Sequence, residues 1–317
     1  GIQNKKGGLQ TILTIDGGTI KGAAGDGILN DGGQLDISGA ALISGKGGTV
    51  ESGMVGIRNT NDGTVTIKGA ISSLTGTQAA ILIDSGKMNI TSTGSISGSG
   101  NGIQNIGTGN TAIDGRISNY DLAVKNSSSG AAGATNAASV TISASAVITG
   151  NAGKGTAIIN DGNAALNFAG TITNYGIGIQ HTNSYGTVSE VSVLTISGGK
   201  ITVADIGVSN LVGTANITGG TIQGGIAVDN AADAILTIGT DGTLTGTGEA
   251  AVRNAGTATI STGMIVNGNA VGVLNTGAIT FDNAVEIRAK DAAISSTAGT
   301  LTITTGAKIT GNASNAV

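Results

Sequence analysis

Short apolar runs recur along the whole chain and are separated by turns rich in glycine, asparagine and aspartate. Within the runs, apolar and polar residues alternate, as in the segments L-T-I, V-T-I and A-T-I. This period of two is typical of a β-strand that buries one face. The β-branched residues isoleucine, valine and threonine dominate the runs, and they favour strands. The pattern therefore predicts an all-β chain of many short strands.

The strands belong to a repeat, because thirteen units of the chain can be aligned. Each unit begins with a small residue, then isoleucine or valine, then a variable residue, and usually an asparagine. A-V-R-N at 251–254 and G-V-L-N at 272–275 are two copies of this beginning. The interval between units varies from 20 to 34 residues and averages about 24.

Three positions of the unit are apolar in all thirteen copies and form three columns. The first column consists of Ile2, Ile28, Ile57, Ile81, Ile103, Val124, Ile158, Ile179, Val208, Val228, Val252, Val273 and Ile294. The second consists of Ile15, Ile37, Ile67, Ile90, Ile113, Ile142, Phe168, Ile196, Ile217, Ile238, Ile260, Phe281 and Ile303. The third consists of Ile20, Ile43, Ile71, Ile96, Ile117, Ile148, Ile172, Ile201, Ile222, Leu244, Ile265, Ile287 and Ile309.

The repeat predicts a parallel β-solenoid. No unit can bury its apolar side alone, but units stacked in parallel bury one continuous core. We therefore expect residues 1–317 to form a single domain, a right-handed parallel β-helix with three strands per coil and about thirteen coils. Uneven coil lengths and the absence of strict hexapeptide repeats favour the right-handed form.

Composition agrees with a narrow core and limits the function. The chain contains only five aromatic residues and no proline, cysteine or tryptophan. Charged residues make up 11% of the chain and the net charge is −4, which argues against nucleic acid as a partner. No apolar run is long enough for a membrane helix, so we expect no membrane insertion by this segment. We also expect no disulfide and no cofactor.

The asparagine of the unit is the most prominent polar column. Its members are Asn4, Asn30, Asn59, Asn105, Asn126, Asn160, Asn210, Asn230, Asn254 and Asn275, and its exceptions are Ile83, His181 and Ser296. Ten stacked amides could serve as a ligand array. We favour a structural ladder, in which each amide binds the turn backbone and the amide of the next coil. His181, the single histidine, then replaces a turn asparagine, because no second histidine or cysteine exists to share a metal.

Catalytic chemistry on a solenoid of this kind would need carboxylates paired on one face of adjacent coils. The outward column of the first strand contains one acid, Asp229. Asp31, Asp84 and Asp161 share the position after the asparagine column, but they lie in the second, fourth and seventh units. We therefore predict no catalytic residue, no metal site and no enzymatic activity. A polysaccharide lyase or glycoside hydrolase remains the alternative.

A second alternative comes from threonines on the outward face of the middle strand. A regular array of paired threonines, T-x-T, in successive coils could bind ice. The pair occurs only at Thr64 and Thr66, Thr257 and Thr259, and Thr300 and Thr302. We therefore favour an exposed polar sheet over an ice-binding protein.

A surface for recognition is predicted where the rare aromatic residues gather. Tyr120 and Tyr175 occupy matching positions in S-N-Y-D-L-A-V-K-N and T-N-Y-G-I-G-I-Q-H, and Tyr185 lies in an insertion. Insertions are expected at 45–55, 127–139 and 182–192. Exposed aromatic residues are common in binding patches, so Tyr120, Tyr175, His181 and Tyr185 form the candidate recognition patch.

The unit G-I-x-N, followed by G-G-x-I-x-G, resembles the repeats of bacterial autotransporter passenger domains and other large cell-surface adhesins. The resemblance extends over the whole chain. It implies an extracellular or bacterial cell-surface protein that acts in adhesion or biofilm structure, with loops displayed from a solenoid. It implies no particular ligand.

We therefore expect a non-catalytic structural or adhesive protein, a stiff rod or a component of a filament. The expected partners are further solenoid repeats of the same chain or other copies stacked end to end, and a host or bacterial surface protein or glycan. Ile2 already stands in the first apolar column, and the residues 315–317, N-A-V, resemble the start of another unit. These features suggest a segment of a longer solenoid or a subunit of a stacking fibre.

Overall fold

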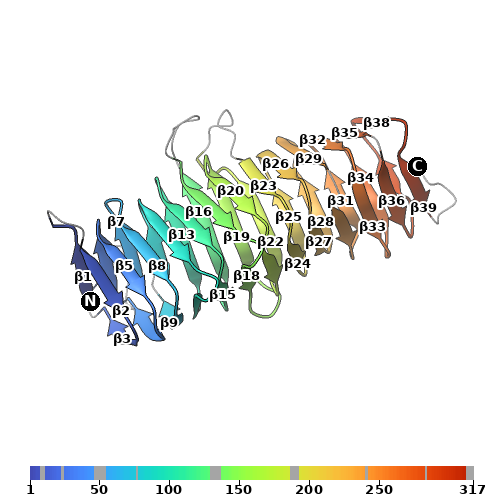
Figure 1. The fold of residues 1–317 in the computed structure, drawn as a ribbon. Helices are drawn as coiled ribbons and strands as arrows, with labels where there is room; N and C mark the ends of the chain where they lie inside the picture. Colours follow the sequence, from blue (N-terminus) through green and yellow to red (C-terminus); the bar gives the residue numbers. More distant parts are fainter. Residues whose placement is uncertain are drawn as a thin grey trace. The chain divides into compact units, whose positions relative to one another are not determined.

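The structure is a computed structural model of the chain. It describes residues 1–7, 11–22, 25–45, 55–75, 78–128, 137–185, 193–239, 242–282 and 284–311. These residues form 39 strands in three parallel sheets of thirteen strands each, and none of them is helical. The all-β solenoid with three strands per coil is confirmed, and each of the thirteen units contributes one strand to every sheet (Figure 1).

Sheet A contains the first strand of every unit. Its strands are β1 (Ile2–Lys5), β4 (Ile28–Asp31), β7 (Ile57–Thr60), β10 (Ile81–Ile83), β13 (Asn101–Ile106), β16 (Leu122–Ser128), β19 (Thr156–Gly162), β22 (Ile177–Thr182), β25 (Ile206–Asn210), β28 (Ile226–Asn230), β31 (Ala250–Asn254), β34 (Val271–Asn275) and β37 (Ile294–Ser296).

Sheet B contains the middle strand of every unit. Its strands are β2 (Ile12–Ile15), β5 (Gln34–Ile37), β8 (Thr64–Ile67), β11 (Lys87–Ile90), β14 (Asn110–Ile113), β17 (Ser139–Ile142), β20 (Ala165–Phe168), β23 (Val193–Ile196), β26 (Gly213–Ile217), β29 (Ala234–Ile238), β32 (Thr257–Ile260), β35 (Ala278–Phe281) and β38 (Thr300–Ile303).

Sheet C contains the third strand of every unit. Its strands are β3 (Gly18–Lys21), β6 (Ala41–Ser44), β9 (Ala70–Thr75), β12 (Ser95–Gly98), β15 (Arg116–Ser118), β18 (Val147–Thr149), β21 (Thr171–Thr173), β24 (Lys200–Thr202), β27 (Thr221–Gly224), β30 (Thr243–Gly246), β33 (Gly263–Asn267), β36 (Val285–Ala289) and β39 (Lys308–Gly311).

The chain also divides into two compact parts, each of which contains several of the repeat units. From here on, unit 1 means residues 1–151 and 157–166, and unit 2 means residues 152–156 and 167–317. Within each unit, neighbouring strands of a sheet pair in parallel with equivalent residues aligned. For example, β4 pairs with β7 in unit 1, and β28 pairs with β31 in unit 2. Each unit is therefore a stack of coils in which the apolar columns are continuous.

The three predicted apolar columns form the core. All of their members are buried except Ile2, Ile20, Ile303 and Ile309. These four residues belong to the first and last described coils, which have a described neighbour on one side only. Full burial of an isoleucine or valine side chain contributes about 1.5–3 kcal/mol, and the ordering of the chain offsets most of this gain.

Sheet B contributes a fourth inward column that the sequence alignment did not separate. It lies two residues before the second column and includes Leu35, Val65, Met88, Leu194 and Leu236, all at most 1% exposed. Strand alternation explains it, because residues two apart on a strand share a face. Both faces of each L-T-I segment are thus assigned: leucine and isoleucine point inward and threonine points outward.

Candidate functional site

The asparagine column forms a ladder of side-chain hydrogen bonds inside each unit. Where asparagines follow one another in successive coils, the Nδ2 atom of one donates to the Oδ1 atom of the next. The bonds in unit 1 are Asn4 to Asn30 (2.8 Å), Asn30 to Asn59 (2.7 Å), Asn105 to Asn126 (2.9 Å) and Asn126 to Asn160 (2.8 Å). The bonds in unit 2 are Asn210 to Asn230 (2.7 Å), Asn230 to Asn254 (2.8 Å), Asn254 to Asn275 (2.8 Å) and Asn275 to the Oγ atom of Ser296 (3.0 Å).

The second N–H of each amide binds the backbone of the turn between sheets A and B. Asn30 Nδ2 lies 2.9 Å from the carbonyl oxygen of Gly33, and Asn105 Nδ2 lies 3.0 Å from that of Gly109. The asparagines are buried, and their side chains lie inside the solenoid at the corner between sheets A and B. The structural ladder predicted from the sequence is therefore confirmed, and these amides are used by the protein itself.

In two coils the corner beside the ladder has no room for a side chain. A Cβ atom on Gly63 would lie 2.6 Å from Asn30 Nδ2 and 2.6 Å from Asn59 Oδ1. A Cβ atom on Gly109 would lie 2.3 Å from Asn105 Oδ1. Other coils accept alanine at the equivalent position, where the carbonyl oxygens of Ala164 and Ala234 accept hydrogen bonds from the asparagine four residues earlier.

Ile83 interrupts the ladder in unit 1, and neighbouring groups satisfy the amides on either side. Asn59 Nδ2 donates instead to the carbonyl oxygens of Gly63 (2.8 Å) and Ser85 (2.9 Å). Asn105 Oδ1 accepts a hydrogen bond from Thr111 Oγ1 at 3.0 Å. Thr111 stands in the fourth inward column and is buried. A buried threonine thus replaces the missing amide donor.

His181 takes the place of an asparagine beside Asn210 in unit 2. It is fully buried and aligned with Asn210 in the pairing of β22 with β25. Asn210 Nδ2 donates to Asn230, but Asn210 Oδ1 is buried and has no hydrogen-bond partner. A buried acceptor without a donor costs about 1–3 kcal/mol. This position is therefore a weak point of the ladder.

We expect His181→Asn to increase the stability of unit 2 by about 1 kcal/mol, because an amide at 181 can donate to Asn210 Oδ1. The measurements are the midpoint of thermal unfolding and the rate of hydrogen exchange at the backbone N–H of Asn210, each compared with the unchanged chain. Ser296→Asn is the matched control, because Ser296 already accepts from Asn275 and little should change. A clear loss of stability in His181→Asn would mean that the imidazole contributes something that an amide does not.

The predicted recognition patch of Tyr120, Tyr175, His181 and Tyr185 is wrong as an exposed surface. Tyr120, Tyr175 and His181 are fully buried, and only Tyr185 is exposed, at 46%. Each buried tyrosine follows an asparagine with positive φ, 67° at Asn119 and 60° at Asn174. This left-handed turn directs the next side chain into the solenoid, where the ring of Tyr120 packs 3.1 Å from the place that a Cβ atom on Gly102 would occupy.

Much of the three predicted insertions lies outside the described residues, namely 46–54, 129–136 and 186–192. The described flanks include Val55, Ser127, Ser128 and His181, which are all buried. The patch prediction therefore retains one exposed aromatic side chain in the described part of the chain, Tyr185.

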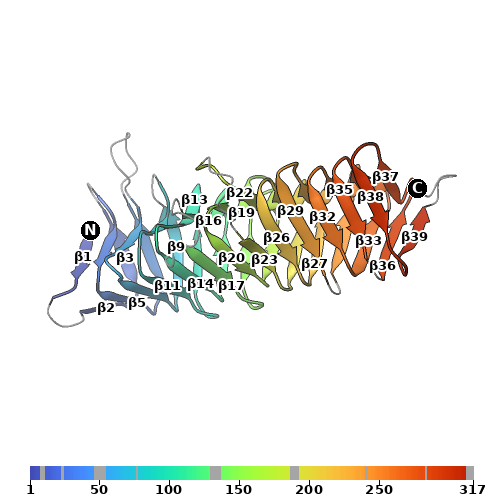
Figure 2. The same cartoon turned by 90° about the horizontal axis from the view of Figure 1, so that it is seen from above.

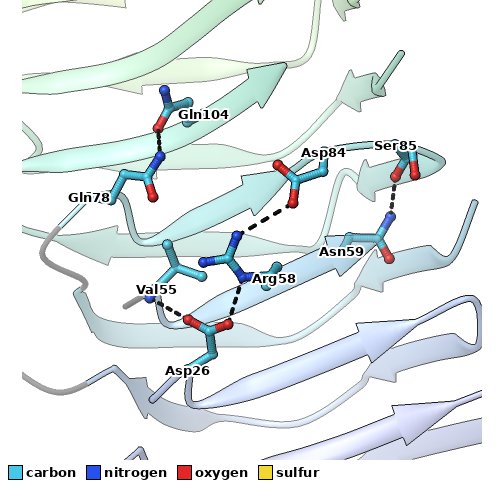
Figure 3. A network of polar contacts seen from close by, with 8 residues as sticks. All are labelled: Asp26, Val55, Arg58, Asn59, Gln78, Asp84, Ser85 and Gln104. Carbon is cyan, nitrogen blue, oxygen red and sulfur yellow. Dashed lines mark hydrogen bonds and ion pairs between the residues drawn. The ribbon is translucent and has the colours of Figure 1, made fainter. Parts of the chain in front are cut away.

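A charged network crosses the outer face of sheet A in unit 1 (Figure 3). Arg58 on β7 lies between Asp26 and Asp84. Its Nε atom is 2.7 Å from Asp26 Oδ2, and its NH1 atom is 3.4 Å from Asp84 Oδ2. Asp26 Oδ1 also accepts from the backbone N–H of Val55 at 2.8 Å. The network connects residues of three successive coils.

The network joins side chains of neighbouring coils, and Arg58 is its central member. Both oxygens of Asp26 are already bound, and Arg58 separates the two carboxylates. Partial burial lowers the pKa of Arg58, but the hydrogen bond and charge of Asp26, followed by those of Asp84, outweigh it, so this pKa is raised. Arg58 is therefore a permanently charged partner of both carboxylates.

Unit 2 has a similar network around Arg253 on β31. Its Nε and NH2 atoms each lie 2.8 Å from an oxygen of Asp229, and its NH1 atom lies 2.9 Å from Glu249 Oε1. The hydrogen bonds that Arg253 donates to Asp229 are the main cause that raises the pKa of Arg253. Asp229 and Arg253 are aligned in the pairing of β28 with β31. Because they occupy the same outward column in successive repeats and have opposite charges, this ion pair could have been predicted from the sequence.

Asp31, Asp84 and Asp161, the acids that share a position in the repeat, each contact a different side chain. Asp84 binds Arg58, while Asp161 is buried and lies 3.9 Å from Lys125 Nζ. Asp31 accepts a hydrogen bond from Asn61. Among the described residues, no three histidine, cysteine, aspartate or glutamate side chains are placed together to hold a metal ion.

A shallow hollow of about 410 Å³ lies on the outer face of sheet A in unit 1. Its lining residues include Gln78, Gln104, Leu122 and Lys125, and the Gln78 amide donates to Gln104 at 3.1 Å. Lys125 is its one charged lining residue. The lining offers no carboxylate pair for glycosidic chemistry.

The outer face of sheet B in unit 2 is uncharged, and we call it the threonine face. It consists of the outward residues Val193, Thr195, Thr214, Asn216, Ile235, Thr237, Thr257, Thr259, Ala278, Thr280, Thr300 and Thr302 on β23, β26, β29, β32, β35 and β38. These six strands lie side by side (Figure 2). The equivalent face of unit 1 differs, because it carries Asp36 and Lys87.

Comparisons of the chain with family models, curated proteins and solved structures find no match. Within the described part of the chain, no helix is long and apolar enough to cross a membrane. The class of protein is therefore defined by its fold: a parallel β-solenoid with a buried asparagine ladder.

Proposed function

We propose that the chain is a structural or adhesive protein of the bacterial surface or the extracellular space, in which a stiff solenoid displays loops without catalysing a reaction. The resemblance of its repeats to autotransporter passenger domains and large adhesins first suggested this role. The proposal rests on chemistry within the coils.

The observation that carries the proposal is the use of polar side chains to hold coils together. The buried amides of the ladder bond from coil to coil, and Arg58 and Arg253 bond to carboxylates of neighbouring coils. An enzyme of this fold would instead need polar groups held ready for a substrate. A mechanical role needs what the described side chains provide, namely repeated cohesion along the stack.

The same chemistry suggests the partner. Each coil presents three parallel strands and an amide rung to the next coil, so another coil of the same kind satisfies all of these groups. Further solenoid repeats, in the same chain or in another copy, are therefore the proposed primary partner. A surface protein or glycan bound by displayed loops is the proposed second partner.

The location can be tested on intact cells of the source organism. Antibodies against the purified chain should label unpermeabilised cells, or fibres outside them, in immunogold electron microscopy. Labelling that requires permeabilisation would contradict the proposal.

We expect no cleavage when the chain is incubated with pectins, glycosaminoglycans or other acidic polysaccharides, because the neighbouring carboxylates Asp26 and Asp84 are bound to Arg58. The measurement is the release of reducing ends or unsaturated products. Asp26→Asn and Asp84→Asn are the informative variants. Turnover by the unchanged chain that either substitution abolishes would establish the enzymatic alternative instead.

A further inference from the structure

The threonine face has a feature that separates it from the other polar positions of the solenoid. Its eight threonine hydroxyls make no hydrogen bond to any described residue of the chain. By contrast, Thr218 and Thr304, which follow sheet B strands, and Thr276, which follows a sheet A strand, donate to backbone carbonyls of the preceding coil at 3.3, 3.2 and 3.4 Å. The hydroxyls on the face are thus available to a ligand.

These hydroxyls stand on a regular grid. Thr237, Thr259, Thr280 and Thr302 are aligned on four successive strands, and Thr195 and Asn216 continue the same column. In the neighbouring column, apolar residues alternate with Thr214, Thr257 and Thr300. Parallel strands lie about 4.8 Å apart, and alternate residues of one strand lie about 6.6 Å apart.

The grid is also stiff. Threonine is restricted at χ1 by its β-branch, so both its hydroxyl and its methyl group keep fixed positions on a regular strand. The core residues beneath the face, such as Leu236, Ile238 and Ile260, are at most 1% exposed and hold the strands in place. The threonine hydroxyl and methyl groups therefore form a fixed pattern before any ligand binds.

The chemistry of the face is unsuited to several common ligands. Protein interfaces depend on tryptophan, tyrosine and arginine anchors, and none of the twelve positions holds one. Nucleic acid requires lysine and arginine, and calcium requires carboxylates. Sugar rings pack on aromatic side chains, which the face also lacks.

We propose that the threonine face binds ordered water and thereby the surface of ice. One repeat of the oxygen atoms in hexagonal ice is close to the spacing between neighbouring strands of the grid. Threonine hydroxyls can take the place of lattice oxygens, while the methyl groups and Val193, Ile235 and Ala278 order water in the gaps. The absence of charge is essential, because strongly hydrated ions would impose a different water structure.

The proposal does not require paired threonines on every strand. The sequence search for T-x-T found only scattered pairs, whereas strand register brings single threonines into one column. Asn216 and the apolar residues add no charge to the face. What distinguishes the surface is eight free hydroxyls without a charge among them.

The intact chain provides the first test. Thermal hysteresis should be measured in a nanolitre osmometer, and uptake into slowly growing ice should be compared with that of an unrelated soluble protein. We expect measurable hysteresis and enrichment of the chain in ice. A chain that shows neither property overturns the proposal, whatever its variants do.

Substitutions then locate the binding surface. Thr237→Lys and Thr259→Lys should reduce ice uptake to the level of the unrelated protein while circular dichroism shows that the fold is kept. Thr66→Lys is the matched control, because Thr66 occupies the equivalent outward position on β8 beside Asp36, and its uptake should remain that of the unchanged chain.

Three results would contradict this location. Full uptake by both unit 2 variants would place binding elsewhere, and equal loss in Thr66→Lys would show a general effect of charge. A dimer in analytical ultracentrifugation that Thr259→Lys disrupts, without any ice uptake by the unchanged chain, would assign the face to a second copy.

Discussion

Asn230→Asp is expected to destabilise unit 2 by about 3–5 kcal/mol at neutral pH, although it exchanges a single NH₂ group for oxygen. Asn230 is fully buried in the middle of the unit 2 ladder. Its amide donates to Asn254 Oδ1 at 2.8 Å and to the carbonyl oxygen of Thr257 at 3.2 Å. A carboxylate would direct a negative oxygen at both of these acceptors.

The loss should depend on pH. Burial and two facing acceptors raise the pKa of the new carboxyl group above the value of about 3.9 that it has in an unfolded chain. The penalty is therefore small at about pH 3, which lies below both pKa values, and it grows as the pH rises. Urea unfolding at about pH 3 and about pH 7 measures this difference.

Asn216→Asp is the matched control, because it makes the same chemical change on the outward face of β26. Surface substitutions of this kind usually change stability by less than about 0.5 kcal/mol. Hydrogen exchange should show the loss in Asn230→Asp concentrated on β25, β28 and β31, since each coil depends on its neighbours. If Asn230→Asp and Asn216→Asp lower the free energy of unfolding equally, the asparagine ladder does not stabilise the fold.

The architecture was predictable because its information is repeated. Thirteen copies of each apolar column expose the strand period, the number of strands per coil and the corner asparagine, even though spacing varies. The strand register aligns Ile28 with Ile57 and Asn30 with Asn59, as the sequence columns imply. Repetition averages out the local ambiguity that normally limits sequence-based assignment of short strands.

The burial of Tyr120 and Tyr175 was not predictable from the columns. Each lies in a polar stretch, which favours an exposed position by composition alone. The decisive features are a left-handed asparagine before each tyrosine and, for Tyr120, the bare Cα of Gly102 in the preceding coil. The second feature depends on the fit between two corners, and alignment of strands does not specify it.

The charged networks were predictable only in part. Asp229 and Arg253 share one outward column on neighbouring coils, so their pairing follows from register. Asp26 stands before β4 and has no equivalent in the aligned columns, yet it lies 2.7 Å from Arg58. Residues in irregular corners reach neighbouring coils through local backbone paths that the repeat leaves undefined.

Ile217→Asp is expected to prevent the coils around β26 from folding. Ile217 is 1% exposed and aligned between Ile196 on β23 and Ile238 on β29. A carboxylate there would lose its hydration without gaining a partner, and it would also break the apolar column. The combined loss exceeds several kcal/mol, which is comparable with the stability of a small group of coils.

A graded series distinguishes charge from packing at the same position. Ile217→Val should lower stability by about 0.5–1.5 kcal/mol, and Ile217→Ala by about 2–5 kcal/mol, because a larger part of the column is emptied. Thr237→Ser, on the exposed face of the next strand, should change stability by less than about 0.5 kcal/mol. Thermal melts and urea titrations measure all of these effects.

Limited proteolysis shows where Ile217→Asp acts. Since coils are stabilised mainly by their immediate neighbours, the new cleavage sites should lie between β23 and β29, while unit 1 resists digestion. The unfolding curve should then show more than one transition, as in other repeat arrays whose cooperativity is broken. If Ile217→Asp and Thr237→Ser are tolerated equally well, the inward and outward assignment of sheet B is wrong, and with it the threonine face.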